Sequence, residues 1–350
     1  MHKSLLSVLA DPISKTKLEI KNNSSSSGEL VIEGTLISPE TGRSYVITKG
    51  IPRFVVTEDQ DQKQTASSFG FKWQQRDTYD SPQVHDTAQK WLLKRYGFST
   101  SSEMRDFFWS RRRILDAGCG SGYTASLWMD SRPPNTEWFG IDISAAIDVA
   151  QERLGIVKNA HYIQADILQL PFGDDTFDTV FSEGVLHHTP STELALKSLA
   201  TVLVPGGEAL FYVYRKKGPI REFTDDHVRE AVAGLDPKEA WALLRPLTSL
   251  GQKLAELHCQ VEVPDDIPYL GIKAGRYDIQ RLIYWHFAKM FWNENLSFEE
   301  NNHVNFDWYH PRYAHRQTEE EVRRWCAQAH LSITHFNVEE SGFTVRAIKR

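Results

Sequence analysis

Residues 112–122 read Arg112-Arg113-Ile114-Leu115-Asp116-Ala117-Gly118-Cys119-Gly120-Ser121-Gly122, and this stretch decides the fold. A short apolar run leads through an acid into a glycine-rich loop, which is typical of a strand that ends before a helix. Glycine allows positive φ and lets a ligand approach the backbone closely. In open α/β folds, ligands bind in the crevice outside the carboxyl ends of the strands. The stretch therefore predicts a ligand-binding loop.

The sequence after this loop alternates between strand-like and helix-like segments. Apolar runs recur at 138–141, 162–163, 179–181 and 209–213, with helical patterns such as 145–154 between them. Continuous apolar strands separated by helices argue for a parallel sheet that is covered on both faces. We therefore expect an α/β fold built on such a sheet.

Helical patterns replace this alternation after Tyr214, and one of them, over 278–292, places its apolar residues on one face. Thr318 with Glu321 forms a capping-box pattern that predicts a further helix, and two strands end the chain. These textures divide the chain into five expected regions: a β-rich unit over 1–57, a linker and helical segment over 58–105, a ligand-binding core over 106–215, a helical cap over 216–317, and a last helix and hairpin over 318–350.

Composition narrows the class of protein. The 350 residues are 41% apolar and 25% charged, which is ordinary for a globular chain. The three cysteines, Cys119, Cys259 and Cys326, are too few and too scattered for a disulfide framework or a Cys-rich metal site, so we expect no metal. We find no secretory signal and no run long enough to span a bilayer, so we expect a cytoplasmic protein without a membrane partner. A formal net charge of -6 argues against a nucleic-acid partner.

Acids near the glycine loop distinguish between two nucleotide ligands. The spacing is G-x-G-x-G, and Asp116 stands two residues before the first glycine. A carboxylate there would repel a pyrophosphate at a helix N-terminus, but it would suit the ammonium and sulfonium of S-adenosylmethionine (SAM). Asp142 and Asp166 end the next two predicted strands, where they could accept hydrogen bonds from a ribose and from an adenine amino group. The acids therefore favour SAM over a dinucleotide.

These segments resemble the class I SAM-dependent methyltransferase family, in its small-molecule branch. The resemblance covers residues 114–209 and rests on six segments in order: Leu115–Gly122, Gly140–Asp142, Ala165-Asp166, Leu170–Phe172 with Phe177-Asp178, Ser182–His188, and Leu203–Gly207. It implies a doubly wound, seven-stranded, mostly parallel Rossmann-like sheet that an antiparallel hairpin completes.

The resemblance also implies roles for the matching positions. Asp116, with Gly118, Cys119 and Gly120, would orient the methionine part of SAM. Asp142 with Ile143 would hold the ribose, and Asp166 with Ile167 would frame the adenine. Ser182 and Glu183 would border the transferring methyl group.

Catalytic residues are less determined by the sequence. His187 and His188 follow the fourth predicted strand and are candidates for a proton-accepting base, the alternative being ordinary loop residues. Tyr309 and His315 belong to the polar-aromatic stretch 307–316, which either packs the cap on the core or recognises the acceptor. The segment 69–73 (Phe-Gly-Phe-Lys-Trp) either packs at the entry to the core or closes over SAM.

The first region has a resemblance of its own. Its segments are similar to a small zinc ribbon attached to some methyltransferases, but Asp11, Ser14, Ser38 and Thr41 stand where that ribbon has cysteines. Hydroxyls are poor zinc ligands beside thiolates. We therefore expect a ribbon without zinc that serves as a structural or docking unit.

Together these features predict a SAM-dependent methyltransferase for a small or medium-sized acceptor, such as a secondary metabolite or a sugar-containing intermediate, with methylation at oxygen, nitrogen or carbon. Two alternatives stay open: an RNA methyltransferase, and a non-catalytic SAM-binding partner that regulates another enzyme. The acceptor and the oligomeric state, a homodimer included, are not specified by the sequence.

Overall fold

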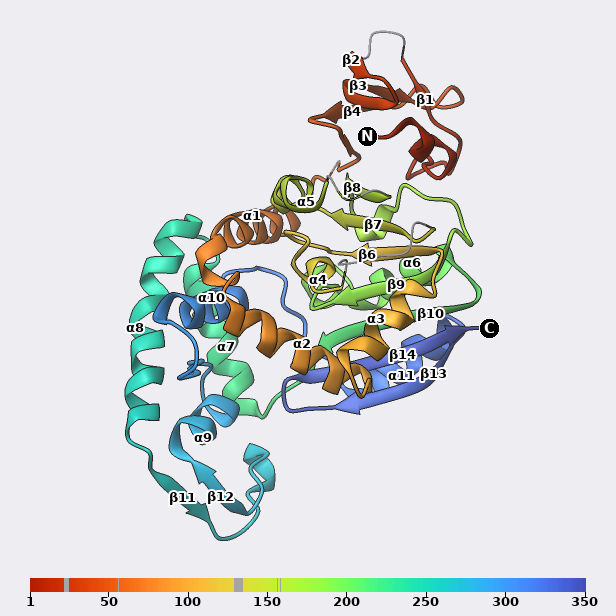
Figure 1. Ribbon diagram of the computed structural model, residues 1–350. Coiled ribbons are helices and arrows are strands. Elements are labelled where there is room, and N and C mark those ends of the chain that lie inside the picture. Colours follow the sequence, from red (N-terminus) through yellow and green to blue (C-terminus); the bar gives the residue numbers. More distant parts are fainter. Residues whose placement is uncertain (22–24, 56, 129–134, 156, 158) are drawn as a thin grey trace.

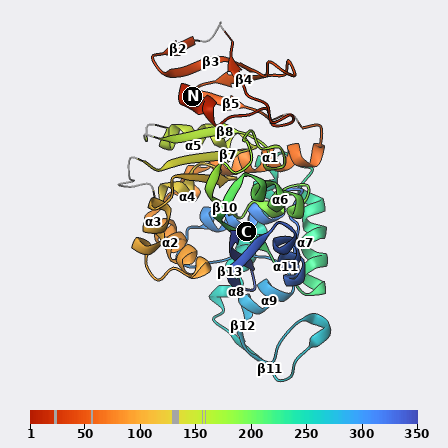
Figure 2. The same ribbon diagram turned by 90° about the vertical axis from the view of Figure 1, so that its right-hand side faces the viewer.

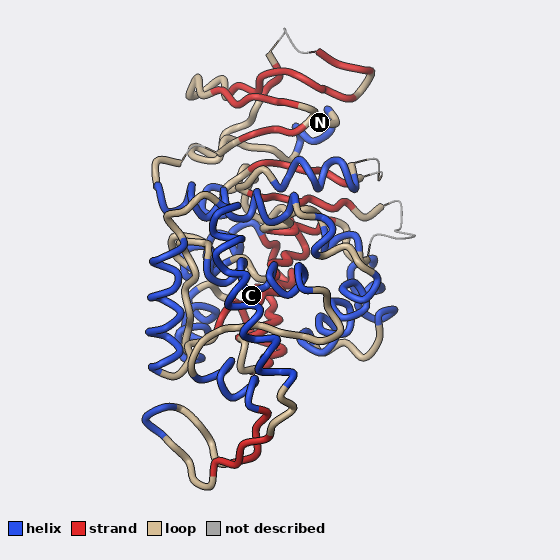
Figure 3. Tube along the Cα trace, turned by 90° about the vertical axis from the view of Figure 1, so that its left-hand side faces the viewer, coloured by secondary structure: helices blue, strands red, loops and turns tan. Residues whose placement is uncertain are grey.

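A single large sheet runs through the protein. The computed structural model describes residues 1–21, 25–55, 57–128, 135–155, 157 and 159–350. In these residues the sheet has twelve strands in the order β1-β3-β4-β5-β8-β7-β6-β9-β10-β14-β13, with β2 paired to β3. Figure 3 shows its strands as a continuous band with helices on both sides. The strands are β1 (Glu19–Ile20), β2 (Ser25–Ser27), β3 (Leu30–Ile37), β4 (Ser44–Thr48), β5 (Ile51–Arg53), β6 (Arg113–Ala117), β7 (Glu137–Asp142), β8 (Ala160–Gln164), β9 (Phe177–Glu183), β10 (Leu203–Tyr214), β13 (Leu331–Val338) and β14 (Gly342–Lys349).

The middle of this sheet has the expected α/β topology. Strands β8, β7, β6, β9 and β10 are mutually parallel, and β14 and β13 close the sheet in antiparallel pairings. These strands number seven. The expected total of seven strands is nevertheless wrong, because the whole sheet has twelve in the described residues. Strand β5 pairs in parallel with β8 through Arg53 and Gln164, so the N-terminal strands extend the same sheet beyond the core (Figure 2).

Helices cover the two faces of the core sheet (Figure 1). One buried cluster joins α6 and α11 to Leu115, Phe139 and Val180, and a second joins α2, α3 and α5 to Ile114 and Trp138. Successive residues of β6 and β7 thus point into opposite apolar layers, as alternation along a strand requires. The helices are α1 (Gln60–Gln74), α2 (Pro82–Tyr96), α3 (Ser101–Trp109), α4 (Tyr123–Ser126), α5 (Ala146–Leu154), α6 (Thr192–Val202), α7 (Pro219–Val232), α8 (Pro237–Glu256), α9 (Ile279–His286), α10 (Phe298–Tyr309) and α11 (Glu319–Gln328). Short 3-10 turns occur at Lys3–Ser7, Arg76–Thr78, Ile167–Gln169, Leu186–His188 and Pro268–Leu270.

The cap consists of α7 to α10 and a hairpin of β11 (Gln260–Val263) and β12 (Gly275–Asp278). The helix expected over 278–292 is wrong in its second half, because α9 ends at His286. Tertiary contacts hold the residues that follow in an irregular path. The Gln280 side chain donates to the Met290 carbonyl (2.8 Å), and the Phe291 amide donates to Asn305 Oδ1 (2.8 Å). The capping box at Thr318 and Glu321 is confirmed and opens α11.

The four positions at which the similar zinc ribbon has cysteines, Asp11, Ser14, Ser38 and Thr41, lie together. Asp11 is fully buried, and its carboxylate accepts from the Ser14 amide (2.9 Å) and from Thr41 Oγ1 (3.2 Å). The Thr41 amide in turn donates to Ser38 Oγ (3.3 Å). Although burial alone would raise the pKa of Asp11, these and further hydrogen bonds, one from the Tyr45 hydroxyl, lower it. A hydrogen-bonded carboxylate therefore occupies the centre of this unit.

The described residues contain no group of three or more His, Cys, Asp or Glu side chains placed to hold a metal ion. None of the helices formed by them combines the length and the apolar character that a membrane span needs.

Candidate active site

A cavity of about 700 Å³ opens where the parallel strands end. Its walls come from regions that are far apart in the sequence: the loops after β6 to β9, helices α1 and α2 with the segment between them, the end of β10, the cap, and the turn between β13 and β14. The volume is within the usual range for ligand sites, about 300–1,000 Å³. Two ends can be distinguished. We call the part lined by the loops after β6, β7 and β8 the donor end, and the part lined by β10 and the cap the acceptor end.

The glycine loop forms one wall of the donor end. Gly118 has φ +81° and Gly120 has φ +54°, a region that favours glycine. A Cβ on Gly118 would lie 2.3 Å from Val185 Cγ1, and one on Gly120 would lie 2.7 Å from Trp73 Nε1. The amides of Gly118 and Cys119 donate to the Ile141 carbonyl. The loop is thus pressed between the core and α1, with no room for side chains.

Carboxylates at the ends of β7 and β8 line the same end of the cavity. Asp142 accepts from the Gly120 amide (2.9 Å) and from the Ser144 amide and hydroxyl (2.8 and 2.6 Å). Asp166 accepts from the Leu168 amide (2.9 Å) and from Gln62 Nε2 (2.8 Å). Burial raises the pKa of both carboxyls. Ile143 and Ile167, the residues that follow these two acids, also line the cavity.

Two other predicted donor residues lie behind the lining. Asp116 is buried under the loop, where Trp138 Nε1 donates to it (3.3 Å), and burial raises its pKa to about 7. Ser182 is fully buried and donates to the Ala117 carbonyl (2.9 Å), which fastens β9 to the end of β6. Both residues support the loop and leave the contact with a ligand to Gly118 and Cys119.

Glu183 lies between the two ends of the cavity. Arg95 Nη1 donates to one of its oxygens (2.5 Å) and the Tyr96 hydroxyl to the other (2.6 Å). Burial raises the pKa of Glu183, and the adjacent Arg95 opposes that shift. Helix α2 therefore holds this carboxylate in place.

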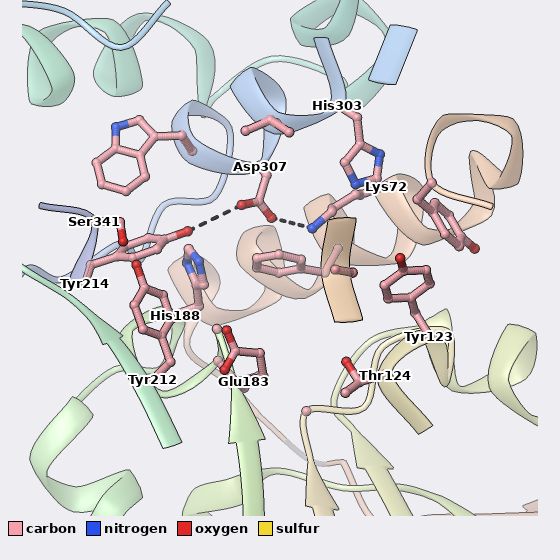
Figure 4. Close-up of a pocket in the computed structure, with 18 of the residues that line it drawn as sticks. Lys72, Tyr123, Thr124, Glu183, His188, Tyr212, Tyr214, His303, Asp307 and Ser341 are labelled. Atoms are coloured by element: carbon pink, nitrogen blue, oxygen red, sulfur yellow. Dashed lines mark hydrogen bonds and ion pairs between the residues drawn. The ribbon is translucent and has the colours of Figure 1, made fainter. Parts of the chain in front are cut away.

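A charged cluster crosses the acceptor end (Figure 4). Lys72 Nζ of α1 donates to Asp307 Oδ1 of α10 (2.5 Å), and the Tyr214 hydroxyl at the end of β10 donates to Asp307 Oδ2 (3.3 Å). Burial alone would raise the pKa of Asp307, but Lys72, His188 and Lys289 hold it well below its usual range. Asp307 is therefore an ionised acceptor of hydrogen bonds.

Of the four predicted catalytic residues, only His188 lines the cavity. Its Nδ1 donates to the Tyr313 carbonyl (2.6 Å), which leaves the lone pair on Nε2. Nε2 is buried and has no hydrogen-bond partner in the described part of the chain. Burial lowers the pKa of His188 to about 4, so the ring is neutral at pH 7.

The other three lie outside the lining. His187 is fully buried and stacks on Tyr214 (centroids 3.6 Å apart). The Tyr309 hydroxyl donates to Asp225 inside the cap (3.0 Å), and His315 stacks on Tyr313. These three residues lie behind the walls of the cavity, and their catalytic role stays a prediction. The stretch 307–316, interpreted either as packing of the cap on the core or as an acceptor-recognition loop, begins as the last turn of α10.

The comparisons with known proteins agree with this geometry. Residues 115–211 match the methyltransferase domain family. Within these residues the chain contains a methyltransferase domain.

Curated relatives match only part of the chain. Over 129 residues the chain is 32% identical to the ubiquinone/menaquinone biosynthesis C-methyltransferase UbiE of Idiomarina loihiensis, covering 36% of this chain and 49% of that protein. Over 99 residues it is 34% identical to the tRNA U34 carboxymethyltransferase of Nautilia profundicola, covering 28% and 32%. The chain thus spans less than half the length of either relative. Among solved structures, magnesium protoporphyrin IX methyltransferase (ChlM) from Synechocystis PCC 6803 with bound SAM aligns with 85% of this chain and 100% of that one, at 13% identity and a TM-score of 0.43.

Several residues that line the cavity of this methyltransferase domain were missed in the sequence, most of them outside residues 115–211. Lys72 lies in the segment 69–73, which we had noted only for its aromatic residues, and Asp307 opens the stretch 307–316. No sequence pattern indicates Gln62, Arg95 or Tyr214 as site residues. The hydrogen-bond partners of these polar side chains are distant in the sequence, so neighbouring residues do not reveal them.

Proposed function

We propose that the protein transfers a methyl group from SAM to a small or medium-sized acceptor held beneath the cap. The main support is that one cavity joins the carboxylate-lined donor end to an acceptor end enclosed by α1, β10 and the cap. Direct displacement needs two reactants to be aligned and water to be excluded. A cavity with distinct ends provides both.

The donor end fits SAM. We assign ribose binding to Asp142 with Ile143, adenine contacts to Asp166 with Ile167, and the methionine part to the glycine loop. Each carboxylate oxygen can accept more than one hydrogen bond, so both acids can also bind ligand hydroxyl or amino groups. The Tyr123 hydroxyl lines the cavity beside the loop and has no hydrogen-bond partner among the described residues. It is suited to donate to the carboxylate of the methionine part.

Bound SAM supplies a methyl group on a positively charged sulfur. The chain's own groups would position the acceptor: Glu183 borders the methyl group, and Asp307 accepts a hydrogen bond from the acceptor beside Tyr214. Where the acceptor must lose a proton, we assign the base role to His188 Nε2. Its Nδ1 is oriented by a backbone carbonyl, and Nε2 has no hydrogen-bond partner among the described residues.

Calorimetry with S-adenosylhomocysteine, followed by transfer from methyl-labelled SAM to a panel of phenols, quinones, amines and bulk tRNA, tests this proposal. We expect binding of S-adenosylhomocysteine and label in a small acceptor. Binding without transfer to any acceptor would favour the non-catalytic regulatory partner. Absence of binding would overturn the proposal.

A tRNA acceptor is the second candidate, because the relatives include a tRNA U34 carboxymethyltransferase. An RNA enzyme needs cationic groups free to bind phosphates. Here the formal net charge is -6, and Arg111 and Arg113, in the basic run before the glycine loop, are paired with Glu208 and Glu137. Label in tRNA, with binding that weakens steeply as salt is raised, would favour this candidate.

We also propose that residues 1–57 form a ribbon-like unit in which Asp11 replaces the metal. The support is the convergence of Asp11, Ser14, Ser38 and Thr41 on one hydrogen-bonded cluster. Metal analysis of the purified protein tests this proposal, and stoichiometric zinc would overturn it.

A further inference from the structure

The wall of the acceptor end that faces away from the donor end contains three cations. Lys217 follows β10, Arg221 lies in the first turns of α7, and Lys289 lies in the irregular segment after α9; all three line the cavity. We call these residues the cationic wall. The Arg221 guanidinium lies 5.5 Å from the centre of the Trp308 ring, over which Lys289 also lies, and Lys217 Nζ lies 5.7 Å from the centre of the Trp285 ring.

Lys289 is the most deeply placed ammonium of this wall. The residue is 6% exposed, and its Nζ lies 4.3 Å from the centre of the Trp308 ring. The hydrogen bonds that hold Met290 and Phe291 fix the backbone just after it, and the Ala288 amide, just before it, donates to the Ile283 carbonyl. Burial lowers its pKa to about 7. The ammonium is thus held at the cavity wall by a rigid segment.

Two carboxylates near the wall, those of Asp225 and Asp307, have other partners. Asp225 binds Arg221 through both oxygens (2.8 Å each) and accepts from Tyr309. Asp307 is bound by Lys72 and Tyr214. Lys217 Nζ donates to backbone carbonyls, including that of Ser341 (3.2 Å). In the described residues, neither Lys217 nor Lys289 has a carboxylate within ion-pair distance.

Burying a charge without a counter-charge is costly, and here the buried charges face a cavity. The same end is lined by the aromatic rings of Tyr214, Tyr284, Trp285 and Trp308. A ligand with a flat apolar body and one negative group would pair with the ammonium groups and cover these rings. A neutral ligand would leave Lys217 and Lys289 unpaired in a drier cavity.

We propose that the acceptor carries a carboxylate or a phosphate, which the cationic wall binds mainly through Lys289, and an aromatic or otherwise planar body. This inference deepens the proposed function and rests on it. It predicts that a negative group on the acceptor lies at the cap side of the cavity, while the atom to be methylated points toward Glu183 and His188.

The test uses the full-length protein saturated with S-adenosylhomocysteine and three fluorinated probes: 4-fluorobenzoate, 4-fluorophenyl phosphate and the neutral 4-fluorobenzamide. Fluorine NMR titration measures each affinity. We expect at least one anionic probe to bind about tenfold more tightly than the amide, the usual size of a charge-assisted contact. Which anion binds better identifies the group as carboxylate or phosphate.

Variants assign the effect to the wall. Lys289→Met should reduce the preference for the anion to about twofold or less, and Lys289→Arg should retain most of it. Lys273→Met is the matched control, because the Lys273 side chain is 81% exposed. It should leave the preference for the anion unchanged. If Lys289→Met does not fold, Lys217→Met should still lower the preference severalfold.

Two results would overturn the inference: equal affinities for the anionic and neutral probes in the wild type, or an anion preference that survives both Lys289→Met and Lys217→Met. Binding of S-adenosylhomocysteine is measured first. Its absence contradicts the proposed function, whereas its presence without anion preference contradicts only the cationic wall.

Discussion

The donor and acceptor ends of the cavity are built from different kinds of contact. At the donor end, Gly118 directly follows β6, Asp142 is the last residue of β7, and Asp166 is the second residue after β8. At the acceptor end, Lys72 meets Asp307 across 235 residues and Tyr214 meets it across 93. The first end follows from the order of the strands. The second exists only after α1 and the cap have packed together.

The two ends of the cavity therefore depend on different parts of the fold. Donor residues sit on strands that are buried on both faces, so their positions are fixed by the core. Acceptor residues sit on helices whose relative placement depends on a few buried polar contacts. A different cap on the same core would therefore change the acceptor without changing the donor.

The largest expected effect of a single substitution is at the donor end. Gly118→Ala would place a Cβ 2.3 Å from Val185 in a residue with φ +81°. We expect affinity for S-adenosylhomocysteine to fall at least about 100-fold, because backbone strain and a displaced loop both oppose binding. Calorimetry provides the measurement.

Gly206→Ala is the matched control. Gly206 has φ +78°, but a Cβ there would meet nothing within 4 Å, so the substitution adds the same backbone strain without the contact. It should leave the affinity unchanged. Equal losses in the two variants would show that strain alone, and not the closeness of the loop to β9, governs donor binding.

The next effect concerns the pair at the acceptor end. Lys72→Met and Asp307→Asn should each lower the free energy of unfolding by about 3 kcal/mol, because each leaves a largely buried charge unpaired. The double variant should lose less than the sum. Donor affinity should stay within about threefold of wild type. Chemical denaturation and calorimetry measure both quantities.

The exposed pair Lys90–Asp86, with side chains 74% and 62% exposed, is the control, and its removal should cost less than about 1 kcal/mol. Additive losses for Lys72 and Asp307 would mean that the two residues act separately. A large loss of donor affinity would mean that the ends of the cavity are not independent.

The same contrast explains how far sequence reasoning reached. The strand order, the closing hairpin and the donor acids follow local rules, in which apolar runs predict buried strands and acids after them meet at one edge. Asp116 and Ser182 were placed at the right strands, but the sequence does not tell a lining residue from one behind it. That distinction depends on which side of the loop a side chain points.

At the acceptor end, sequence reasoning failed for physical reasons. The apolar face over 278–292 continues the helical period past His286, but Gln280 and Asn305 bind the backbone of Met290 and Phe291 and hold it out of a helix. Tyr309 and His315 share a polar-aromatic stretch with Asp307, yet only Asp307 faces the cavity. Tertiary partners decide these positions, 10 and 14 residues away for Met290 and Phe291, 84 for Tyr309 and 235 for Asp307.

A third effect concerns the pH dependence of stability. Burial lowers the pKa of His188 to about 4 in the folded protein, against about 6.5 when unfolded. Between these values the unfolded chain binds a proton that the folded one does not, so stability is full above pH 6.5 and falls toward pH 4.

His188→Gln should therefore reduce this decline in the free energy of unfolding by about 2 kcal/mol. The measurement is chemical denaturation between pH 4 and 7, and the readout is the slope of the unfolding free energy against pH, not its absolute value. His227→Gln, on the exposed face of α7, should leave the slope as in wild type. An unchanged slope in His188→Gln would show that this ring is protonated in the folded protein, and would contradict its assignment as a neutral base.

The smallest effect tests whether the donor end is purely local. Gln62 of α1 donates to Asp166 Oδ2 across 104 residues, which is the one contact of this kind that we find between α1 and the donor acids in the described chain. Gln62→Met removes a hydrogen bond worth about 1 kcal/mol, so donor affinity should fall about fivefold. Gln60→Met, an exposed neighbour on the same helix, should have no effect. If Gln62→Met also leaves donor affinity unchanged, Asp166 is oriented by its own loop, and α1 contributes to the acceptor end only. If donor affinity falls nearly as far as in Gly118→Ala, α1 is part of the donor site, and SAM binds only when this helix is packed on the core.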